Sequence, residues 1–244
     1  MNYFVHYAVF LKKFLRVKHP LKVVFDCSDG TVGLVLKELF KTYKLINLKL
    51  INSSPNGNFP AHGPNPMAKN ALRDVRFAIR RFRADLGVIF DADGDRVFFA
   101  DDKGRSIVPD HAAIALASNF KGPVIVDVRA GYALREWLQA EKREIVESRG
   151  GHYFVKQMMR QKKINFAAEA SGHYYFKDFF YADSGIFAAI QMMNFLAKRK
   201  AQSAKRGQTE KLSDWIDALP HYFNSGELNF HVADKEGIME KIET

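Results

Sequence analysis

The chain has 244 residues, with 37 lysines and arginines against 27 aspartates and glutamates, which gives a formal net charge of +10. A hydrophobic content of 47% with only 8 prolines excludes intrinsic disorder and a collagen-like architecture. Cys27 is the only cysteine, which excludes an internal disulfide and a thiolate zinc cluster, and we expect a cytoplasmic protein. The positive charge attracts nucleic acid, anionic membranes and phosphorylated metabolites alike, so local motifs must distinguish them.

The first twenty residues are apolar and then basic, which is the reverse of a signal peptide, and the apolar run is too short to span a bilayer. Tyr3, Tyr7, Phe10 and Phe14 follow helical spacing, which predicts an amphipathic helix within residues 1–20. We expect its aromatic face to pack on the rest of the protein, and we expect no membrane span.

From Pro20 onward, short β-rich runs alternate with helix-length segments, a pattern typical of βαβ units. The first cycle predicts strands at 22–26, 45–51 and 86–90, with helices at 32–43 and 68–82. The second cycle predicts strands at 124–128, 144–147 and 164–168, with helices near 133–139 and 153–160. The fold class is therefore α/β, with two consecutive domains whose mixed, mostly parallel sheets are covered by helices.

Lys121, Gly122 and Pro123 lie between the two cycles, and a boundary there gives domains at 21–120 and 121–222. A helix is predicted at 212–219, a strand at 227–232 and a short helix near the end of the chain. The segment 223–244 is too short to form a domain of its own.

Three carboxylates, Asp91, Asp93 and Asp95, occupy alternate positions directly after the strand predicted at 86–90. Charges so close repel one another unless a hard divalent cation neutralises them. The strand places this loop at the carboxyl edge of the sheet, where α/β proteins bind ligands. A metal site is favoured over a solvated acidic turn.

An EF-hand is the first alternative, because Asp102 falls where its twelfth-position carboxylate belongs. The sixth position, however, holds Arg96 in place of glycine, and the preceding segment is strand-like. An arginine beside the carboxylates indicates an anionic ligand shared with the metal, as in phosphoryl transfer. These features favour Mg²⁺ over Ca²⁺.

Two further loops carry polar groups after predicted strands. Glu169, Ser171 and His173 offer a hydrogen-bond acceptor, a hydroxyl and a titratable ring to a polyol. The segment 148–152 precedes a helix that carries Lys156 in its first turns, which suits anion binding at a helix N-terminus. Either signal alone is weak, because such turns also occur as ordinary helix caps.

Taken together in this order, these elements resemble the α-D-phosphohexomutase family, and most closely its bacterial phosphomannomutase/phosphoglucomutase branch. The segment 91–96 resembles the family's metal-binding loop and 169–173 its sugar-binding loop, while 56–60 and 64–66 are similar to a loop of its second domain. The resemblance implies that Asp91, Asp93 and Asp95 bind Mg²⁺ and that Glu169, Ser171 and His173 bind the sugar.

The reaction that the resemblance implies is a reversible phosphate transfer between positions 1 and 6 of a hexose, through a bisphosphate intermediate. His173, and after it His152, is expected to exchange the proton of the sugar hydroxyl. Arg96 is expected beside the active-site phosphoserine. Arg129 stands where close relatives carry lysine and is expected to act only as a cation, because a guanidinium keeps its proton at physiological pH.

The resemblance covers domains two and three of the family, and Ser225 to Phe230 is similar to the beginning of domain four. The family's Ser-His-Asn-Pro nucleophile motif and its phosphate-clamping domain are not found in this sequence. We therefore expect these residues to be part of a mutase, with hexose phosphate as ligand and a separate polypeptide as a possible source of the serine. The alternative is a non-catalytic remnant that binds Mg²⁺ and sugar phosphate or serves as an interaction domain.

A row of arginines along the helix predicted at 68–82 raises the question of nucleic-acid binding. Arg73, Arg76 and Arg80 follow helical spacing, with Arg83 after them. Such a row is more often a solvated helix face, and charge alone gives only salt-sensitive, non-specific affinity. We expect no specific nucleic-acid partner.

Overall fold

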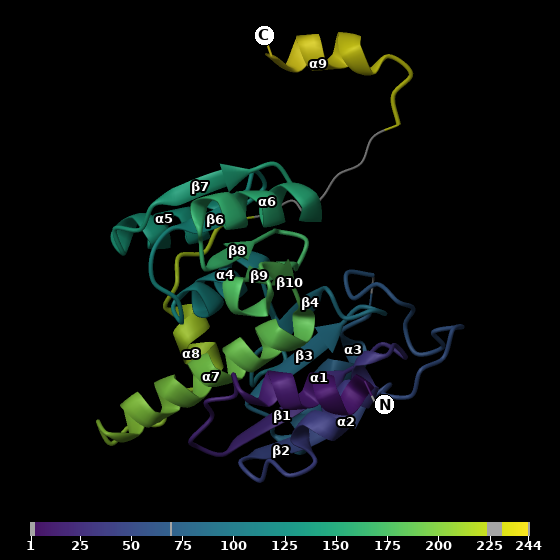
Figure 1. Ribbon diagram of the computed structural model, residues 1–244, viewed down its shortest axis with the longest axis vertical. Coiled ribbons are helices and arrows are strands. Elements are labelled where there is room, and N and C mark those ends of the chain that lie inside the picture. Colours follow the sequence, from purple (N-terminus) through teal and green to yellow (C-terminus); the bar gives the residue numbers. More distant parts are fainter. Residues whose placement is uncertain (1–2, 69, 224–230, 244) are drawn as a thin grey trace.

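The computed structural model describes residues 3–68, 70–223 and 231–243, and it contains two α/β units (Figure 1). The first sheet has the spatial order β2 (Ile46–Ile51), β1 (Leu21–Asp26), β3 (Leu86–Phe90), β4 (Val97–Ala100), β5 (Ser106–Ile107). Strands β2, β1 and β3 are parallel, and β4 and β5 are added by antiparallel pairing. The crossover helices are α2 (Val32–Phe40) and α3 (Arg73–Phe82).

The second sheet repeats this topology. Its spatial order is β7 (Ile145–Ser148), β6 (Val124–Asp127), β8 (Phe166–Ala168), β9 (Tyr174–Phe176), β10 (Ala182–Asp183). The first three strands in this order are parallel and the last two antiparallel, with α5 (Tyr132–Ala140) and α6 (His152–Lys162) as crossovers. The loop after the third strand along the chain therefore has the same topological position in both units.

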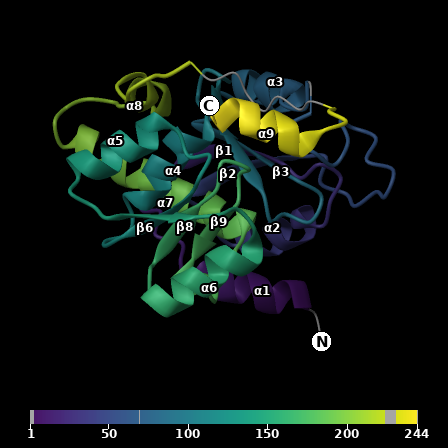
Figure 2. The same cartoon turned by 90° about the horizontal axis from the view of Figure 1, so that it is seen from above.

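The remaining elements are α1 (Tyr3–Lys12), α4 (Pro109–Ala117), a 3₁₀ turn (Lys177–Phe179), α7 (Gly185–Ala204), α8 (Leu212–Asp217) and α9 (Lys235–Glu243). Helix α7 contacts β3 and β4 of the first unit as well as α4. Figure 1 shows α4 and α7 between β6 of the second unit and β1 of the first, and Figure 2 shows the same elements from above. Apolar residues of both sheets and both helices form one buried cluster, so the two units share a core.

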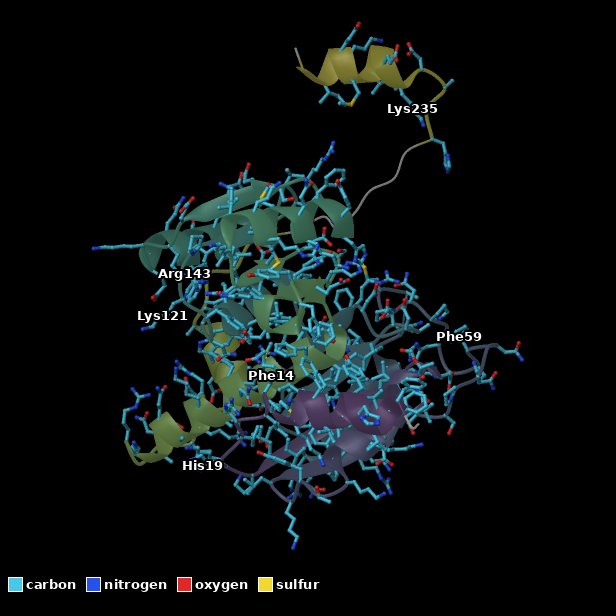
Figure 3. The ribbon with its side chains drawn as sticks, in the orientation of Figure 1. Phe14, His19, Phe59, Lys121, Arg143 and Lys235 are labelled. Carbon is cyan, nitrogen blue, oxygen red and sulfur yellow. The ribbon has the colours of Figure 1, made fainter. Side chains whose placement is uncertain are left out.

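The aromatic face of α1 packs as its spacing predicts. Phe10 lies 6.0 Å from Phe179, and Phe14, just beyond the helix, lies 4.8 Å from Phe187 of α7, measured between ring centroids. Figure 3 labels Phe14 at this junction of α1 and α7. Tyr3, by contrast, is 76% exposed.

The predicted fold class, α/β with two units and mixed, mostly parallel sheets, is confirmed. The change from one sheet to the other falls within residues 108–123, so the boundary at 120/121 lies in this connection and stays a prediction. The strand predicted at 227–232 lies largely outside the described residues. None of the helices in the described part of the chain combines the length and apolar character needed to cross a bilayer.

Candidate active site

The loop that follows β3, residues 91–96, is called the metal loop after the family loop that it resembles, and it curls around the side chain of its first residue. Asp91 Oδ1 accepts hydrogen bonds from the backbone N–H groups of Gly94 at 3.0 Å and Arg96 at 3.1 Å. The Arg96 Nε donates to Asp91 Oδ2 at 2.7 Å. Gly94 has a φ of +80°, the left-handed conformation that glycine adopts without steric cost and that closes the turn before β4.

One oxygen from each of Asp91, Asp93 and Asp95 lies within 4.8 Å of the other two. Burial raises the pKa of Asp91 to about 6, together with its hydrogen bond to Asp95. The hydrogen bond to His173 lowers the pKa of Asp95 to about 2. Because the donor set consists of carboxylate oxygens alone, these residues fit a hard cation such as Mg²⁺.

The sugar loop, residues 169–173, follows β8 and is organised around Glu169, which is 4% exposed. The backbone N–H of Gly151 donates to Glu169 Oε1 at 2.7 Å, and the hydroxyl of Tyr175 donates to Oε2 at 2.9 Å. Burial raises the pKa of Glu169, but the donors from His173, Gly151 and Tyr175 outweigh it and hold this pKa at about 2. Glu169 is therefore a fixed anion at the edge of the second sheet.

His173 joins the two loops. Its Nδ1 lies 3.3 Å from Glu169 Oε2, and its Nε2 lies 3.5 Å from Asp95 Oδ2. Burial lowers the pKa of His173, but hydrogen bonds to the two carboxylates outweigh it and raise the pKa to about 9. The backbones also meet, since Arg96 and His173 form an antiparallel bridge.

Two glycines permit this close approach of the backbones. The Val97 N–H donates to Gly172 O at 3.1 Å, and the Gly185 N–H at the start of α7 donates to Gly94 O at 2.9 Å. A Cβ on Gly172 would lie 2.8 Å from the Phe98 ring, and one on Gly185 would lie 2.7 Å from Gly94 O. The metal loop and the sugar loop are thus held together by backbone as well as by side chains.

His152 is the first residue of α6 and lies beside the sugar loop. Its ring centroid lies 4.6 Å from that of His173, and its Nδ1 lies 2.7 Å from Asp183 Oδ2. Lys156, one turn further along α6, places its Nζ 3.1 Å from Asp183 Oδ1. The structure therefore brings His152 and Lys156 to the same place as the sugar loop.

The sequence motifs did not indicate Asp183 or Tyr175. Asp183 ends β10 within Tyr-Ala-Asp-Ser, a local context without any feature that marks a functional carboxylate. Tyr175 lies in a buried strand where an aromatic residue is expected for packing alone. Both side chains reach the site through the pairing of β9 with β8 and β10, which only the tertiary structure reveals.

Arg129 lies on the other side of the sugar loop, after β6. Its Nε and Nη2 donate to Asp127 Oδ2 at 2.9 and 2.7 Å. A Cβ on Gly150 would lie 3.5 Å from Arg129 Nη2 and 3.5 Å from Glu169 Oε1. The side chains of Arg129 and Glu169 therefore both approach Gly150. The guanidinium, on a side chain that is 52% exposed, adds positive charge at this position.

The loop after β1 packs against the backbone of the metal loop at Ala92. The Thr31 N–H donates to Ala92 O at 3.3 Å, and a Cβ on Gly30 would lie 2.1 Å from the same oxygen. Asp102, the residue that an EF-hand would use, instead accepts a hydrogen bond from the Ser213 N–H at 2.8 Å. The metal loop therefore differs from an EF-hand in three dimensions as well as in sequence.

The middle of the segment 56–66 packs against the end of β1 and the loop that follows it. His62 Nε2 lies 3.2 Å from Asp26 Oδ2, and the Ala61 N–H donates to Asp29 Oδ2 at 3.0 Å. Phe59, labelled in Figure 3, lies in the outer part of this segment, away from α7. Ala61 and His62 thus tie this segment to the end of β1 and the loop after it.

Two models of one family match the chain. "Phosphoglucomutase/phosphomannomutase, alpha/beta/alpha domain II" matches residues 2–104, and domain III of the same family matches residues 108–222. A phosphomannomutase of Methanocaldococcus jannaschii is 31% identical over 226 residues, which are 91% of this chain and 48% of that protein. A phosphomannomutase of Escherichia coli K12 is 30% identical over 248 residues, 97% of this chain and 53% of that protein.

Solved structures agree with this assignment. A phosphoglucomutase/phosphomannomutase family protein from Burkholderia thailandensis superimposes with a TM-score of 0.78 at 28% identity, over 90% of this chain and 47% of that one. An N-acetylphosphoglucosamine mutase from Aspergillus fumigatus, in complex with GlcNAc-6P and magnesium, has the same fold with a TM-score of 0.62 at 16% identity, over 90% of this chain and 53% of that one. The chain spans about half the length of the curated relatives that it matches. It belongs to the phosphoglucomutase/phosphomannomutase family, of which it contains the α/β domains II and III.

Proposed function

We propose that this chain carries the metal-binding and sugar-binding part of a phosphohexomutase active site. The reaction is the interconversion of a hexose 1-phosphate and a hexose 6-phosphate, with mannose or glucose as the sugar, through a bisphosphate. The observation that supports this proposal best is the contact between His173 and Asp95, because it joins the two loops into one site. Each loop lies at the carboxyl end of a parallel strand, where such sheets bind ligands.

The metal loop supplies the electrostatic part of this site. Asp91, Asp93 and Asp95 hold Mg²⁺, which when bound offsets the negative charge on the transferring phosphoryl group. Arg96 lies against Asp91 and Asp95 and adds a fixed cation beside the phosphate. Arg129 adds a second cation at the border of the sugar loop and binds a phosphate oxygen, but it transfers no proton because its guanidinium stays protonated.

The sugar loop supplies orientation and proton transfer. Glu169 and Ser171 accept and donate hydrogen bonds to sugar hydroxyls. His173 places Nε2 toward the metal loop, where it exchanges a proton with the oxygen that gains or loses the phosphoryl group. His152 lies at the N-terminus of α6 with its ring centroid 4.6 Å from that of His173, and it is the second candidate for this proton exchange. The first backbone N–H groups of α6 suit binding of the non-transferring phosphate.

Turnover needs a covalent phosphoryl carrier, since the phosphate must reside on the enzyme between the two half-reactions. No Ser-His-Asn-Pro segment occurs within these 244 residues. We therefore propose that the activity requires a serine-bearing segment from elsewhere, either in a longer chain or in a separate polypeptide.

A coupled assay tests this proposal. The purified 244-residue chain, supplied with Mg²⁺, glucose 1-phosphate and glucose 1,6-bisphosphate, is expected to form no glucose 6-phosphate. Addition of a phosphoserine-bearing first domain from a relative is expected to produce turnover with this chain and none with its Asp93→Asn variant. Turnover by the chain alone would contradict the proposal, while retained ligand binding without turnover in the mixture would favour the non-catalytic alternative.

A further inference from the structure

Four side chains with nitrogen and oxygen donors meet where the two units join. Asp95 comes from the metal loop, His152 from the start of α6, His173 from the sugar loop and Asp183 from the end of β10. One donor atom from each lies within 4.8 Å of the other three donor atoms. This set differs from the carboxylate group of the metal loop because half of its donors are imidazole nitrogens.

The second observation concerns Asp183, whose side chain is 4% exposed. Its Oδ2 atom is buried and has no hydrogen-bond partner among the residues that the structure describes. His152 Nδ1 lies 2.7 Å from this oxygen, which is close enough for a hydrogen bond, but the two groups do not have the orientation that a hydrogen bond requires. Lys156 contacts the other oxygen at 3.1 Å, so Oδ2, although within ion-pair distance of His152, is a buried carboxylate oxygen that accepts no hydrogen bond from the described residues.

The surroundings orient His173 as metal-binding histidines are usually oriented. Ser171 Oγ lies 2.8 Å from His173 Nδ1, and Glu169 Oε2 lies 3.3 Å from the same atom. A metal ion at Nε2 would replace the proton that this nitrogen directs at Asp95 Oδ2, 3.5 Å away, while the proton on Nδ1 stays directed to Ser171 and Glu169. A carboxylate or hydroxyl that fixes the second ring nitrogen is the common outer partner of a histidine ligand.

We propose that Asp95, His152, His173 and Asp183 form a four-coordinate transition-metal site that binds Zn²⁺. Two imidazoles and two carboxylates suit zinc, whereas Mg²⁺ prefers oxygen ligands alone. Tetrahedral zinc has bonds of about 2.0 to 2.2 Å to nitrogen and oxygen, which places its ligands roughly 3.4 Å apart. The separations in the structure run from 2.7 Å, between His152 Nδ1 and Asp183 Oδ2, to at most 4.8 Å, so Zn²⁺ binding requires this pair to move apart and the wider pairs to move closer.

This site goes beyond the proposed function and would regulate it. Asp95 is shared with the Mg²⁺ site and His173 with the sugar loop, so Zn²⁺ here excludes both Mg²⁺ coordination by Asp95 and sugar binding by His173. The ion would also connect the metal loop of the first unit to three elements of the second. Zinc therefore acts as an inhibitor that fixes the two units in one arrangement.

Cobalt spectroscopy on the full chain tests this site independently of mutase activity. Co²⁺ in a four-coordinate site absorbs strongly in the visible range, whereas Co²⁺ in a six-coordinate oxygen site absorbs weakly. We expect the strong band in the wild-type chain, its displacement by one equivalent of Zn²⁺, and its loss in His152→Gln and in Asp183→Asn. Ser171→Ala removes an outer partner only and is expected to weaken Co²⁺ binding by about 10- to 100-fold.

Two control variants accompany this titration. His19→Gln changes an exposed histidine outside the cluster, and Asp93→Asn changes a carboxylate that belongs only to the Mg²⁺ group; both are expected to keep the band. Circular dichroism checks that every variant is folded. A wild-type chain without the strong band, or a band that survives in folded His152→Gln and Asp183→Asn, would overturn the site. Loss of the band in Asp93→Asn alone would place the metal in the carboxylate group and would also overturn it.

Discussion

Gly172 is the residue at which the sugar loop touches the metal loop. Its φ is +88°, and a Cβ there would lie 2.8 Å from the Phe98 ring and 3.2 Å from Val97 O. The position therefore requires glycine twice, once for the left-handed backbone and once for the space beside β4. Gly207 has a similar φ of +70°, but no atom lies within 4 Å of the place its Cβ would take.

This contrast predicts different effects for the same substitution. Gly207→Ala imposes only the left-handed backbone, at a cost of roughly 1 to 2 kcal/mol in the free energy of unfolding. Gly172→Ala adds steric overlap with Phe98 and is expected to cost about 1 to 3 kcal/mol more. Urea unfolding of both variants measures the difference. Equal losses in the two variants would show that the loops do not pack as closely as the structure indicates.

His111 provides a pH-dependent contribution to stability. The side chain is buried in α4, and its Nε2 lies 2.9 Å from the carbonyl oxygen of Pro220. Burial lowers the pKa of His111, and the nearby His221 acts in the same direction, although the hydrogen bond to Pro220 opposes both. The unfolded chain therefore takes up this proton at a higher pH than the folded chain does.

The sign of the pH effect follows from this difference. The contribution of His111 is complete above the unfolded pKa of about 6.5 and is lost as the pH falls below it. We expect the free energy of unfolding to fall more steeply between about pH 7 and about pH 5.5 in the wild type than in His111→Gln. Urea unfolding at several pH values measures both slopes. Parallel slopes would mean that His111 titrates alike in the folded and unfolded chains.

Site residues that belong to a single sequence motif could be predicted from the sequence. Asp91, Asp93 and Asp95 share a single loop, and Glu169 and His173 share another, so spacing alone relates them. The partners that bridge different elements could not be predicted in this way. The carboxylate of Asp183, for example, reaches His152 only because β10 lies beside α6, a contact between residues that are 31 positions apart in sequence.

Among the elements, α7 depends most clearly on one capping residue. Ser184 precedes the helix, and its Oγ accepts a hydrogen bond from the Phe187 N–H at 3.2 Å. The same oxygen lies 3.3 Å from the hydroxyl of Tyr7 in α1. Ser184 thus satisfies an N–H group in the first turn of α7 and links this helix to α1.

Removal of this cap is expected to destabilise the protein. Ser184→Ala should lower the free energy of unfolding by about 1 to 2 kcal/mol, because a first-turn N–H loses its buried partner. Ser184→Thr retains the oxygen, and Tyr7→Phe removes only the contact with α1, so both should cost less. Thermal unfolding ranks the three variants. A smaller loss for Ser184→Ala than for Tyr7→Phe would contradict the capping role.

Elements with a clear periodicity or a β-rich run were mostly predicted within a few residues, whereas α4, α7 and the short strands were not predicted. Residues 111–117 of α4 are all buried, so this helix has no polar face and its sequence shows no helical period. Strands β5 and β10 contain two residues each, too few to show alternation. The helix predicted from 68 begins at Arg73, because Asn70 has a φ of +69°, which a helix cannot contain.

At the scale of the whole molecule, the candidate site results from a repeated topology. In both units, the strand that comes second along the chain lies at one side of the sheet, followed in space by the first, third, fourth and fifth strands. The metal loop follows β3 and the sugar loop follows β8, which are equivalent strands of the two units. The sequence shows the repeat of strands and helices, but the facing of the two loops depends on α4 and α7 packing between the sheets.

The central claim is that the metal loop and the sugar loop form one site, and linked binding tests it most directly. Calorimetric titration of the chain with glucose 1,6-bisphosphate, with and without Mg²⁺, measures the coupling between the two ligands. We predict that Mg²⁺ raises the affinity for the bisphosphate by about 5- to 150-fold, a typical range for coupled sites, and that Asp93→Asn abolishes this increase. A bisphosphate affinity that is the same with and without Mg²⁺ would contradict a single site.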